Sequence, residues 1–415
     1  MLTISRRAAL LGLGGLAISS LAACNGTSSR RQVRVGIAAG DEGTAVKGIL
    51  TASAPNDYAI TEMPYENLRQ RLKNGLSEDL DEFDLIMIDD PWFPELAEKL
   101  SPVDDLVAST RSDFVPASLK LGMVPYGSGE LRAVPYVGNC QLLFYRTDML
   151  QRVGVSTPPQ TWTALREIAR RMRAEAGKAG YCVRAKSGAP IVSDFLPVLW
   201  SYGGDLFQDT GNPTANNVIV GSAATHTALA AYRDLVSLSP AGAQNFDWTE
   251  MTSAFSRGDA ALELNWPAAI KNLDAEIARG DRQSRRWGVA LPPAEARSTS
   301  MAGNWLLAIP QRSSNRGGAR DAVRLLLERQ REAVVLGNPP TRTSLFSGYN
   351  NRPDLFYLPV LSQALARSTP RPRTPKWNQV EDAVSVEVTR FLTDETTPLA
   401  AANRLQTEIA RIMQP

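Results

Sequence analysis

Two residues that could bind a polyhydroxylated molecule follow a short apolar run. The run from 83 to 88 contains one polar residue, Asp84, and Asp90 and Trp92 come directly after it. Short runs of branched apolar residues are typical of buried parallel strands. Ligands of open α/β sheets bind beyond the carboxyl ends of such strands. We therefore expect Asp90 and Trp92 at the mouth of a crevice, although a turn in which Trp92 only covers the sheet edge fits this stretch equally well.

Strand-like and helix-like segments alternate before this stretch. Runs typical of strands cover 33–37 and 58–63, and helical patterns cover about 44–51 and 67–76. This alternation predicts βαβ units with a parallel sheet, and thus an α/β fold. Glu42 lies in the predicted loop after the first strand and is a second candidate at the crevice edge. Acids at this position also stabilise the N-terminus of a following helix, and that interpretation is the stronger one for Glu42 alone.

The first residues have the pattern of an export signal. Arg6 and Arg7 precede an apolar run from 8 to 23 that ends in small residues before Cys24. This predicts a signal peptide over 1–23 and a polar tether over 24–31. The sequence Leu-Ala-Ala-Cys resembles a bacterial lipobox, which implies lipid attachment at Cys24. The paired arginines resemble a twin-arginine signal, so export by either route stays open.

Size and charge limit the remaining chain. The protein has 415 residues, which is too many for one hydrophobic core, so we expect two lobes. Its 45 basic and 43 acidic residues nearly cancel, which argues against a nucleic-acid-binding surface. No segment after Cys24 is long and apolar enough to span a bilayer. These features predict an extracytoplasmic protein held at the membrane by its lipid.

No catalytic or metal-binding motif is present. The single histidine, His226, lies in a helical run, and no zinc-ligand spacing, P-loop or dinucleotide fingerprint occurs. We therefore expect no cofactor, no metal and no enzyme activity. One alternative is a glycosidase that uses Asp90 and Glu263 as its carboxylate pair. Cys140 and Cys182 could form a disulfide or remain two buried thiols.

Motifs along most of the chain resemble one family, the extracellular solute-binding proteins of ABC importers, of which the maltose-binding protein is typical. The matching segments share their order with the family, and they lie at 83–92, 135–145, 158–162, 255–266, 287–293, 301–309, 339–342 and 371–377. The resemblance implies a periplasmic-binding-protein fold with two discontinuous lobes and three hinge crossings. Lobe one is expected over 32–138 and 291–340, and lobe two over 139–290 and 341–415. The implied partners are a carbohydrate ligand and the permease subunits, and the protein is expected to be monomeric.

The resemblance also suggests the ligand-binding residues. Sugar rings pack on aromatic planes, and their hydroxyl groups need donors and acceptors around the rim. The expected contacts are Glu42, Asp90, Trp92, Asn139, Asn265, Trp266, Gly303, Asn304, Trp305, Arg342 and Trp377. The likeness is strongest to actinobacterial trehalose-binding lipoproteins, so a trehalose-like glucoside is favoured.

Two alternatives remain within this assignment. Each tryptophan could equally belong to a core, since large aromatic residues are mostly buried. Arg342 could bind vicinal hydroxyl groups, bind a phosphate, or form a salt bridge at the hinge. A phosphate contact would favour a glycerophosphodiester or another phosphorylated polyol as the ligand.

Overall fold

The computed structural model describes residues 31–277, 286–349 and 352–415. The predicted signal peptide and Cys24 lie outside the described residues. Residues 32–415 form one compact unit. Within the described ranges, no helix combines the length and the apolar character that crossing a membrane requires.

A five-stranded sheet forms the centre of the first lobe. Its strand order is β2-β1-β3-β10-β6. The strands β1 to β3 run parallel, whereas β10 is antiparallel to both β3 and β6. The bounds are β1 (Val33–Ala38), β2 (Tyr58–Met63), β3 (Leu85–Asp89), β6 (Val134–Val137) and β10 (Trp305–Ala308). The parallel strands confirm the βαβ pattern predicted from the sequence.

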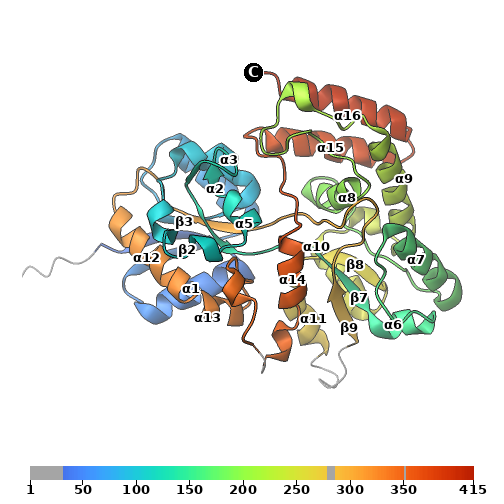
Figure 1. Ribbon diagram of the computed structural model, residues 1–415, viewed down its shortest axis with the longest axis horizontal. Coiled ribbons are helices and arrows are strands. Elements are labelled where there is room, and N and C mark those ends of the chain that lie inside the picture. Colours follow the sequence, from blue (N-terminus) through green and yellow to red (C-terminus); the bar gives the residue numbers. More distant parts are fainter. Residues whose placement is uncertain (1–30, 278–285, 350–351) are drawn as a thin grey trace, which may run out of the picture. The chain divides into compact units, whose positions relative to one another are not determined.

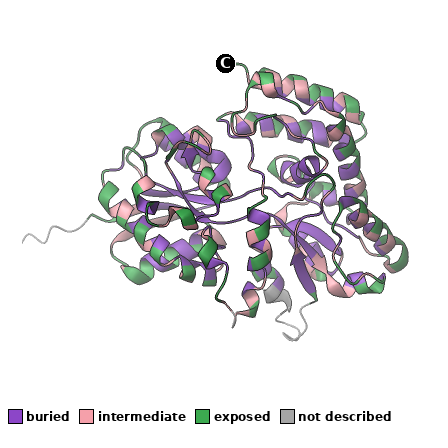
Figure 2. Ribbon diagram, in the orientation of Figure 1, coloured by how far each residue is buried: buried purple, intermediate pink, exposed green. Residues whose placement is uncertain are grey.

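Helices cover this sheet and bury its apolar side chains. Figure 2 shows most strands of this sheet buried, and every residue of β3 is buried, whereas Met63 is the one buried residue of the edge strand β2. The helices of this lobe are α1 (Asp41–Ser53), α2 (Tyr65–Ser77), α3 (Phe93–Leu96), α4 (Asp104–Val107), α5 (Pro116–Lys120), α12 (Arg316–Glu328) and α13 (Gln330–Val335). A small hairpin of β4 (Met123–Val124) and β5 (Glu130–Leu131) lies between α5 and β6 in the chain.

A three-stranded antiparallel sheet, with strand order β8-β7-β9, belongs to the second lobe. Its bounds are β7 (Leu142–Arg146), β8 (Leu262–Asn265) and β9 (Trp287–Ala290). Figure 1 shows α16, α15 and α8 stacked beside α9, with the sheet below them. The helices of this lobe are α6 (Thr147–Arg152), α7 (Trp162–Ala176), α8 (Ala189–Ser201), α9 (Ala223–Ser237), α10 (Trp248–Arg257), α11 (Ala269–Ile277), α14 (Leu358–Leu365), α15 (Trp377–Leu392) and α16 (Pro398–Ile412).

The chain passes three times between the lobes. It leaves the five-stranded sheet after β6, enters the three-stranded sheet at β7, and returns between β9 and β10. The third passage lies between α13, which packs on α1, and α14, which packs on β7. The sequence predicted the second passage at the lobe boundary between 290 and 291. In the structure β9 ends at Ala290 but β10 begins only at Trp305, so this passage is longer than predicted.

Several smaller predictions can also be compared with the structure. Glu42 is the second residue of α1 rather than a loop residue, so the helix begins earlier than predicted. A Cβ on Gly43 would meet the carbonyl oxygen of Ala38 at 1.8 Å, which explains why glycine stands where α1 turns away from β1. Cys140 and Cys182 are both free and buried. The helical position predicted for His226 is confirmed, since it lies in α9.

An ion pair with a buried carboxylate joins β1 to the segment that precedes the central strand β3. The Asp84 side chain has no exposed surface and accepts hydrogen bonds from Arg34 Nη2 at 2.8 Å and Ser313 Oγ at 2.8 Å. Burial alone would raise the pKa of Asp84, but the hydrogen bonds from Arg34 and Ser313 outweigh it and lower the pKa to about 2. The ionised carboxylate therefore stabilises the folded state.

We expect Asp84→Asn to lower the free energy of unfolding by about 2–3 kcal/mol at pH 7, because it removes the charge from several charge-assisted hydrogen bonds. Urea denaturation measures the change. The folded-state pKa of Asp84 is depressed, so the stability that its charge contributes to the parent protein is present above the ordinary pKa of 3.8. This contribution is lost as the pH falls towards 2. Asp382→Asn, at an exposed position on α15, is the control and should change stability by less than about 0.5 kcal/mol. An equal effect of both substitutions would contradict this account.

Candidate ligand-binding site

Three aromatic rings gather at the carboxyl ends of β2 and β3. Tyr65 begins α2, Trp92 follows β3, and Trp305 begins β10, where it pairs with Asp89. The centroids of Tyr65 and Trp92 are 4.7 Å apart, and those of Trp92 and Trp305 are 5.6 Å apart. Trp92 and Trp305 are 4% and 6% exposed, whereas Tyr65 is 38% exposed. Tyr65 therefore presents the accessible aromatic surface, and the two tryptophans support it from behind.

The Tyr65 side chain is held in place by a carboxylate. Its hydroxyl group donates a hydrogen bond to Asp89 Oδ2 at 2.7 Å. Asp89 Oδ1 caps the following turn by accepting from the backbone N–H of Asp90 at 2.9 Å. The sequence interpretation missed Tyr65, although its place two residues after the end of β2 at Met63 is a signal that could have identified it.

Asp90 is the centre of a buried charge cluster. Its side chain has no exposed surface, and its Oδ2 accepts from the backbone N–H of Asn304 at 3.0 Å. Arg371 Nη2 lies 3.4 Å from this oxygen, and Arg373 Nη1 lies 3.3 Å from Oδ1. Burial raises the pKa of Asp90 to about 6 against the opposing effect of the two arginines. The predicted position at a crevice mouth is therefore wrong, because the ionic and backbone partners enclose this carboxylate.

The two arginines come from the segment before α15 and join it to the first lobe. Arg373 also donates to the carbonyl oxygen of Leu121 from Nη2, at 2.6 Å, and Arg371 Nη2 reaches Asp89 Oδ1 at 3.4 Å. Arg371 Nε is buried and has no hydrogen-bond partner. Neither arginine was predicted as a site residue, although both lie in the segment 371–377 that carried the family resemblance.

The structure brings together four predicted residues, of which Asn139, Gly303 and Asn304 lie on the first two passages and Trp266 follows β8. A Cβ on Gly303 would meet the Trp266 ring at 2.5 Å, so glycine permits this close approach. The Gly303 N–H donates to the carbonyl oxygen of Asn139 at 2.9 Å, and the Asn304 side chain donates to the same oxygen at 3.3 Å. The Oδ1 atoms of Asn139 and Asn304 are buried without a partner. These amide oxygens are available to accept hydrogen bonds from a ligand or a water.

Asn265 has no hydrogen-bonding capacity left for a ligand. Its Nδ2 donates to Thr252 Oγ1 at 3.0 Å and to Glu263 Oε1 at 2.7 Å. Its Oδ1 accepts from Trp248 Nε1 at 3.0 Å and from the Trp266 N–H at 2.8 Å. An amide has two donor hydrogens and two acceptor positions, and all four are used. The structure therefore argues against the ligand contact predicted for Asn265.

Two further predicted contacts also have structural partners. Arg342 forms a salt bridge with Asp113 at 3.0 Å and donates to the carbonyl oxygen of Leu327 at 3.2 Å, which matches the salt-bridge alternative. Trp377 is only 3% exposed and packs in the core of the second lobe. Neither side chain offers an open ligand-binding surface.

Two further carboxylates interact electrostatically with Asp89 without forming an ion pair of their own. Glu42 on α1 and Glu381 on α15 are both partly buried, and neither forms an ion pair within the described residues. Burial raises the pKa of Glu42 above its ordinary value, with smaller contributions from Asp41 and Asp89. Burial also raises the pKa of Glu381 to about 7, against the opposing effect of Arg371. The sequence interpretation included Glu42 and missed Glu381.

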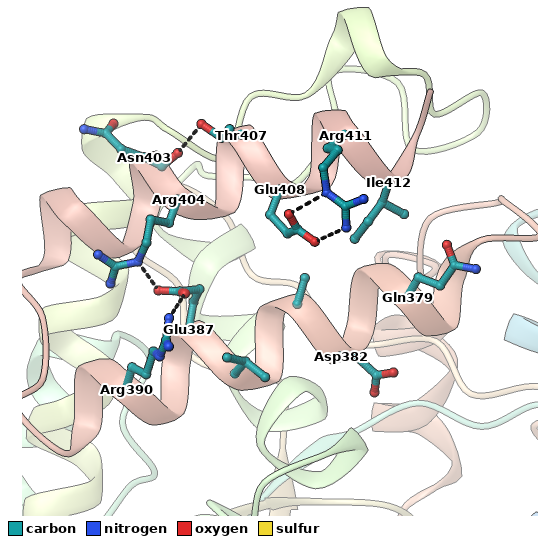
Figure 3. Close-up of a pocket in the computed structure, with 12 residues that line it drawn as sticks. Gln379, Asp382, Glu387, Arg390, Asn403, Arg404, Thr407, Glu408, Arg411 and Ile412 are labelled. Carbon is teal, nitrogen blue, oxygen red and sulfur yellow. Dashed lines mark hydrogen bonds and ion pairs between the residues drawn. The ribbon is translucent and has the colours of Figure 1, made fainter. Parts of the chain in front are cut away.

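A groove of about 850 Å³ lies elsewhere, between α15 and α16 (Figure 3). Most of its charged side chains pair with one another. Glu387 accepts from Arg390 at 3.0 Å and from Arg404 at 2.8 Å, and Arg411 donates to Glu408 at 2.9 Å. Because these charges are already compensated, the groove offers a polar ligand few free groups. Among the described residues, no cluster of His, Cys, Asp and Glu side chains has a metal-binding arrangement.

Two α/β lobes joined by three passages define the class of extracytoplasmic solute-binding proteins. The model of the bacterial extracellular solute-binding protein family matches residues 59–330, and the chain belongs to this family. The expected family and fold are therefore confirmed.

Relatives and solved structures agree with this assignment. A probable ABC transporter-binding protein of Deinococcus radiodurans is 29% identical over 86% of this chain and 87% of its own length. A mannitol-binding protein of Pseudomonas aeruginosa is 27% identical over 68% of this chain and 66% of its own length. The maltose-bound MalE3 of T. maritima superposes with a TM-score of 0.79 and 25% identity, covering 91% of this chain and 99% of that structure.

We expect Arg373→Met to lower the free energy of unfolding by about 3–5 kcal/mol, because it leaves Asp90 buried with one cation fewer. Chemical denaturation at pH 7 measures this loss. Arg257→Met is the matched control, since Arg257 is 62% exposed in its pair with Asp259 and surface pairs contribute about 0–1 kcal/mol. A loss below about 1 kcal/mol for Arg373→Met would contradict the proposed importance of this ion pair.

We expect Glu263→Gln to stabilise the protein at pH 8 by about 1 kcal/mol or more. Glu263 has no exposed surface, and burial raises its pKa well above the ordinary value of 4.5. The protonated Glu263 side chain therefore contributes stability below pH 4.5, and this contribution is lost as the pH rises through the folded-state pKa of Glu263. Urea denaturation from pH 4.5 to 8 should show a gain that grows with pH, and Glu167→Gln, at a side chain 65% exposed, should show none. A difference in the free energy of unfolding between Glu263→Gln and the parent protein that stays constant from pH 4.5 to 8 would contradict this prediction.

Proposed function

We propose that this protein is the substrate-binding component of an ABC importer for a saccharide or polyol. The cluster of Tyr65, Trp92 and Trp305 beside the unpartnered amide oxygens of Asn139 and Asn304 is the observation that carries this proposal. An aromatic surface packs against the C–H face of a sugar ring, while amide oxygens accept from its hydroxyl groups. Two of the similar proteins reported above are named with a solute, mannitol in one case and maltose in the other. Both solutes are consistent with such a ligand.

At the finer level we propose a disaccharide or short oligosaccharide, with a trehalose-like glucoside favoured. We further propose that the lobes comprise 32–138 with 291–340 and 139–290 with 341–415, and that they close on the ligand by hinge bending. Export through the segment 1–23, lipid attachment at Cys24, a monomeric state and delivery to membrane permease subunits complete the proposal.

The alternatives find little support in the geometry. A phosphorylated polyol was suggested by Arg342, whose guanidinium is held by Asp113. A glycosidase would need Asp90 and Glu263 as exposed carboxyl groups, and neither has any exposed surface. Asp90 is surrounded by two arginines, and Glu263 accepts from Asn265 in the interior of the second lobe.

A thermal-shift screen of the purified chain against trehalose, maltose, sucrose, amino sugars and glycerophosphodiesters tests the proposed function. A ligand at 100 times its Kd adds about 2.7 kcal/mol of stability, which raises the Tm by a few degrees. A shift with at least one saccharide is expected. A shift with phosphodiesters alone, or release of monosaccharide during incubation, would overturn the proposal.

We expect Tyr65→Ala to weaken saccharide binding at least about tenfold in calorimetric titration, because it removes the exposed aromatic surface of the site. Tyr65→Phe keeps the ring and loses only the hydrogen bond to Asp89, so it should retain most of the affinity. Tyr349→Ala, at a partly buried ring that packs with Arg331, is the control outside the site. Unchanged affinity in Tyr65→Ala would remove this residue from the site.

A further inference from the structure

Two loop tips, one from each lobe, are in contact. The first tip joins β4 to β5 in the first lobe and carries Tyr126, whose partly buried ring packs against the core of that lobe. The second tip is the turn 209–212 of the second lobe. An ideal Cβ on Gly211 would lie 2.7 Å from Cδ1 of Tyr126, so the absence of a side chain permits this close approach.

Each tip is held in place by its own lobe. Asp209 Oδ1 accepts from the backbone N–H groups of Gly211 at 2.9 Å and of Asn212 at 3.2 Å, which fixes the turn. At the base of this loop Phe207 pairs with Val218, and both side chains are buried in the core of the second lobe. The other tip closes the paired strands β4 and β5. Because both bases are anchored, each tip moves with its lobe.

Arg373 joins the same two tips. Its guanidinium carbon is 5.7 Å from the ring centroid of Tyr126 and 5.6 Å from that of Phe93, and both rings belong to the first lobe. Its backbone N–H donates to the carbonyl oxygen of Thr210, in the turn of the second lobe, at 2.9 Å. The face of an aromatic ring attracts a cation, more strongly where water is excluded, and Arg373 is only 8% exposed. The Tyr126 ring is therefore contacted from the second lobe by Arg373 as well as by Gly211.

We propose that Tyr126, Gly211 and Arg373 form a clasp that holds the two lobes together whether or not a ligand is bound, and that this clasp opens before a ligand enters or leaves. All of its contacts join protein groups, so none of them requires a ligand. Arg373 also forms the ion pair with Asp90 described above, which places the clasp beside the candidate site. The inference rests on the hinge bending proposed above and adds a control of the rate of opening, but it does not depend on the identity of the ligand.

Such a clasp controls the rates of binding rather than the affinity. A contact that stabilises the closed form of the empty and of the occupied protein equally lowers the open fraction of both by the same factor. Association and dissociation both pass through the open form, so they are slowed alike and their ratio, the Kd, is preserved. A side chain that contacts the ligand behaves differently, because its loss mainly speeds dissociation and weakens binding.

Small-angle X-ray scattering of the full chain without added ligand tests whether the clasp holds the lobes together. Tyr126→Ala removes the ring from the first lobe, and Gly211→Leu displaces it from the second. Gly211 has no positive φ, so the added side chain strains the contact and not the backbone. We expect a larger radius of gyration in both variants than in the parent protein, and the Kratky plot of the same data separates opened lobes from an unfolded chain.

Tyr58→Ala is the matched control. Tyr58 is also a partly buried ring on the core of the first lobe, but it begins the edge strand β2, at the opposite side of the sheet from β6. This substitution should leave the radius of gyration unchanged. An equal radius of gyration in the parent protein, Tyr126→Ala and Gly211→Leu would overturn the clasp.

Stopped-flow tryptophan fluorescence with trehalose and with maltose as probes measures the rates. For a probe that binds, Tyr126→Ala should raise the association and dissociation rate constants at least about fivefold each and change the Kd by less than about threefold. A higher Kd at an unchanged association rate would also overturn the clasp, because Tyr126 would then act only on the bound state. If no saccharide binds, the proposed function fails, whereas the scattering result still decides the clasp.

Discussion

The buried contact of Asp90 with Arg371 and Arg373 connects the parts of this protein on which the site depends. Asp90 follows the central strand β3, and the arginines precede α15 of the other lobe. The backbone of Asn304, at the end of the second passage, both donates to Asp90 and accepts from it. Three segments far apart in the sequence thus meet at one carboxylate. Removing the charge of Asp90 or of an arginine would leave the opposite charge buried without its partner, which is destabilising. The ion pairs therefore hold these three segments together.

The same contact also positions the aromatic residues. Trp92 lies two residues after Asp90, and Trp305 directly follows Asn304, so the hydrogen bonds that hold Asp90 also align the two tryptophans. Tyr65 then packs on Trp92 and is oriented by Asp89. Charge and aromatic surface are therefore arranged by one network, in which Asp90 has a positioning role and Tyr65 presents the exposed ring.

Much of the fold could be predicted from local patterns, whereas many of the individual contacts could not. The strands 33–37 and 58–63 and the helix 67–76 have periodicities that depend only on neighbouring residues, and the structure confirms them. Asp90, Asn265 and Arg342 have side chains that could equally bind a sugar or a neighbouring residue. Their actual partners are Arg371 and Arg373, Thr252 and Glu263, and Asp113, which no local pattern connects with them.

The sequence by itself determined the family, the α/β architecture and the region in which polar and aromatic residues gather. Hydrophobic period, turn residues and motif order are properties of short segments, so they can be recognised before folding is known. Only the tertiary structure decided which of these residues remain accessible. Burial and partner choice depend on segments brought together by the three passages, and this is why Tyr65 and Glu381 emerged as exposed or unpaired groups while Asp90 and Trp377 became part of the interior.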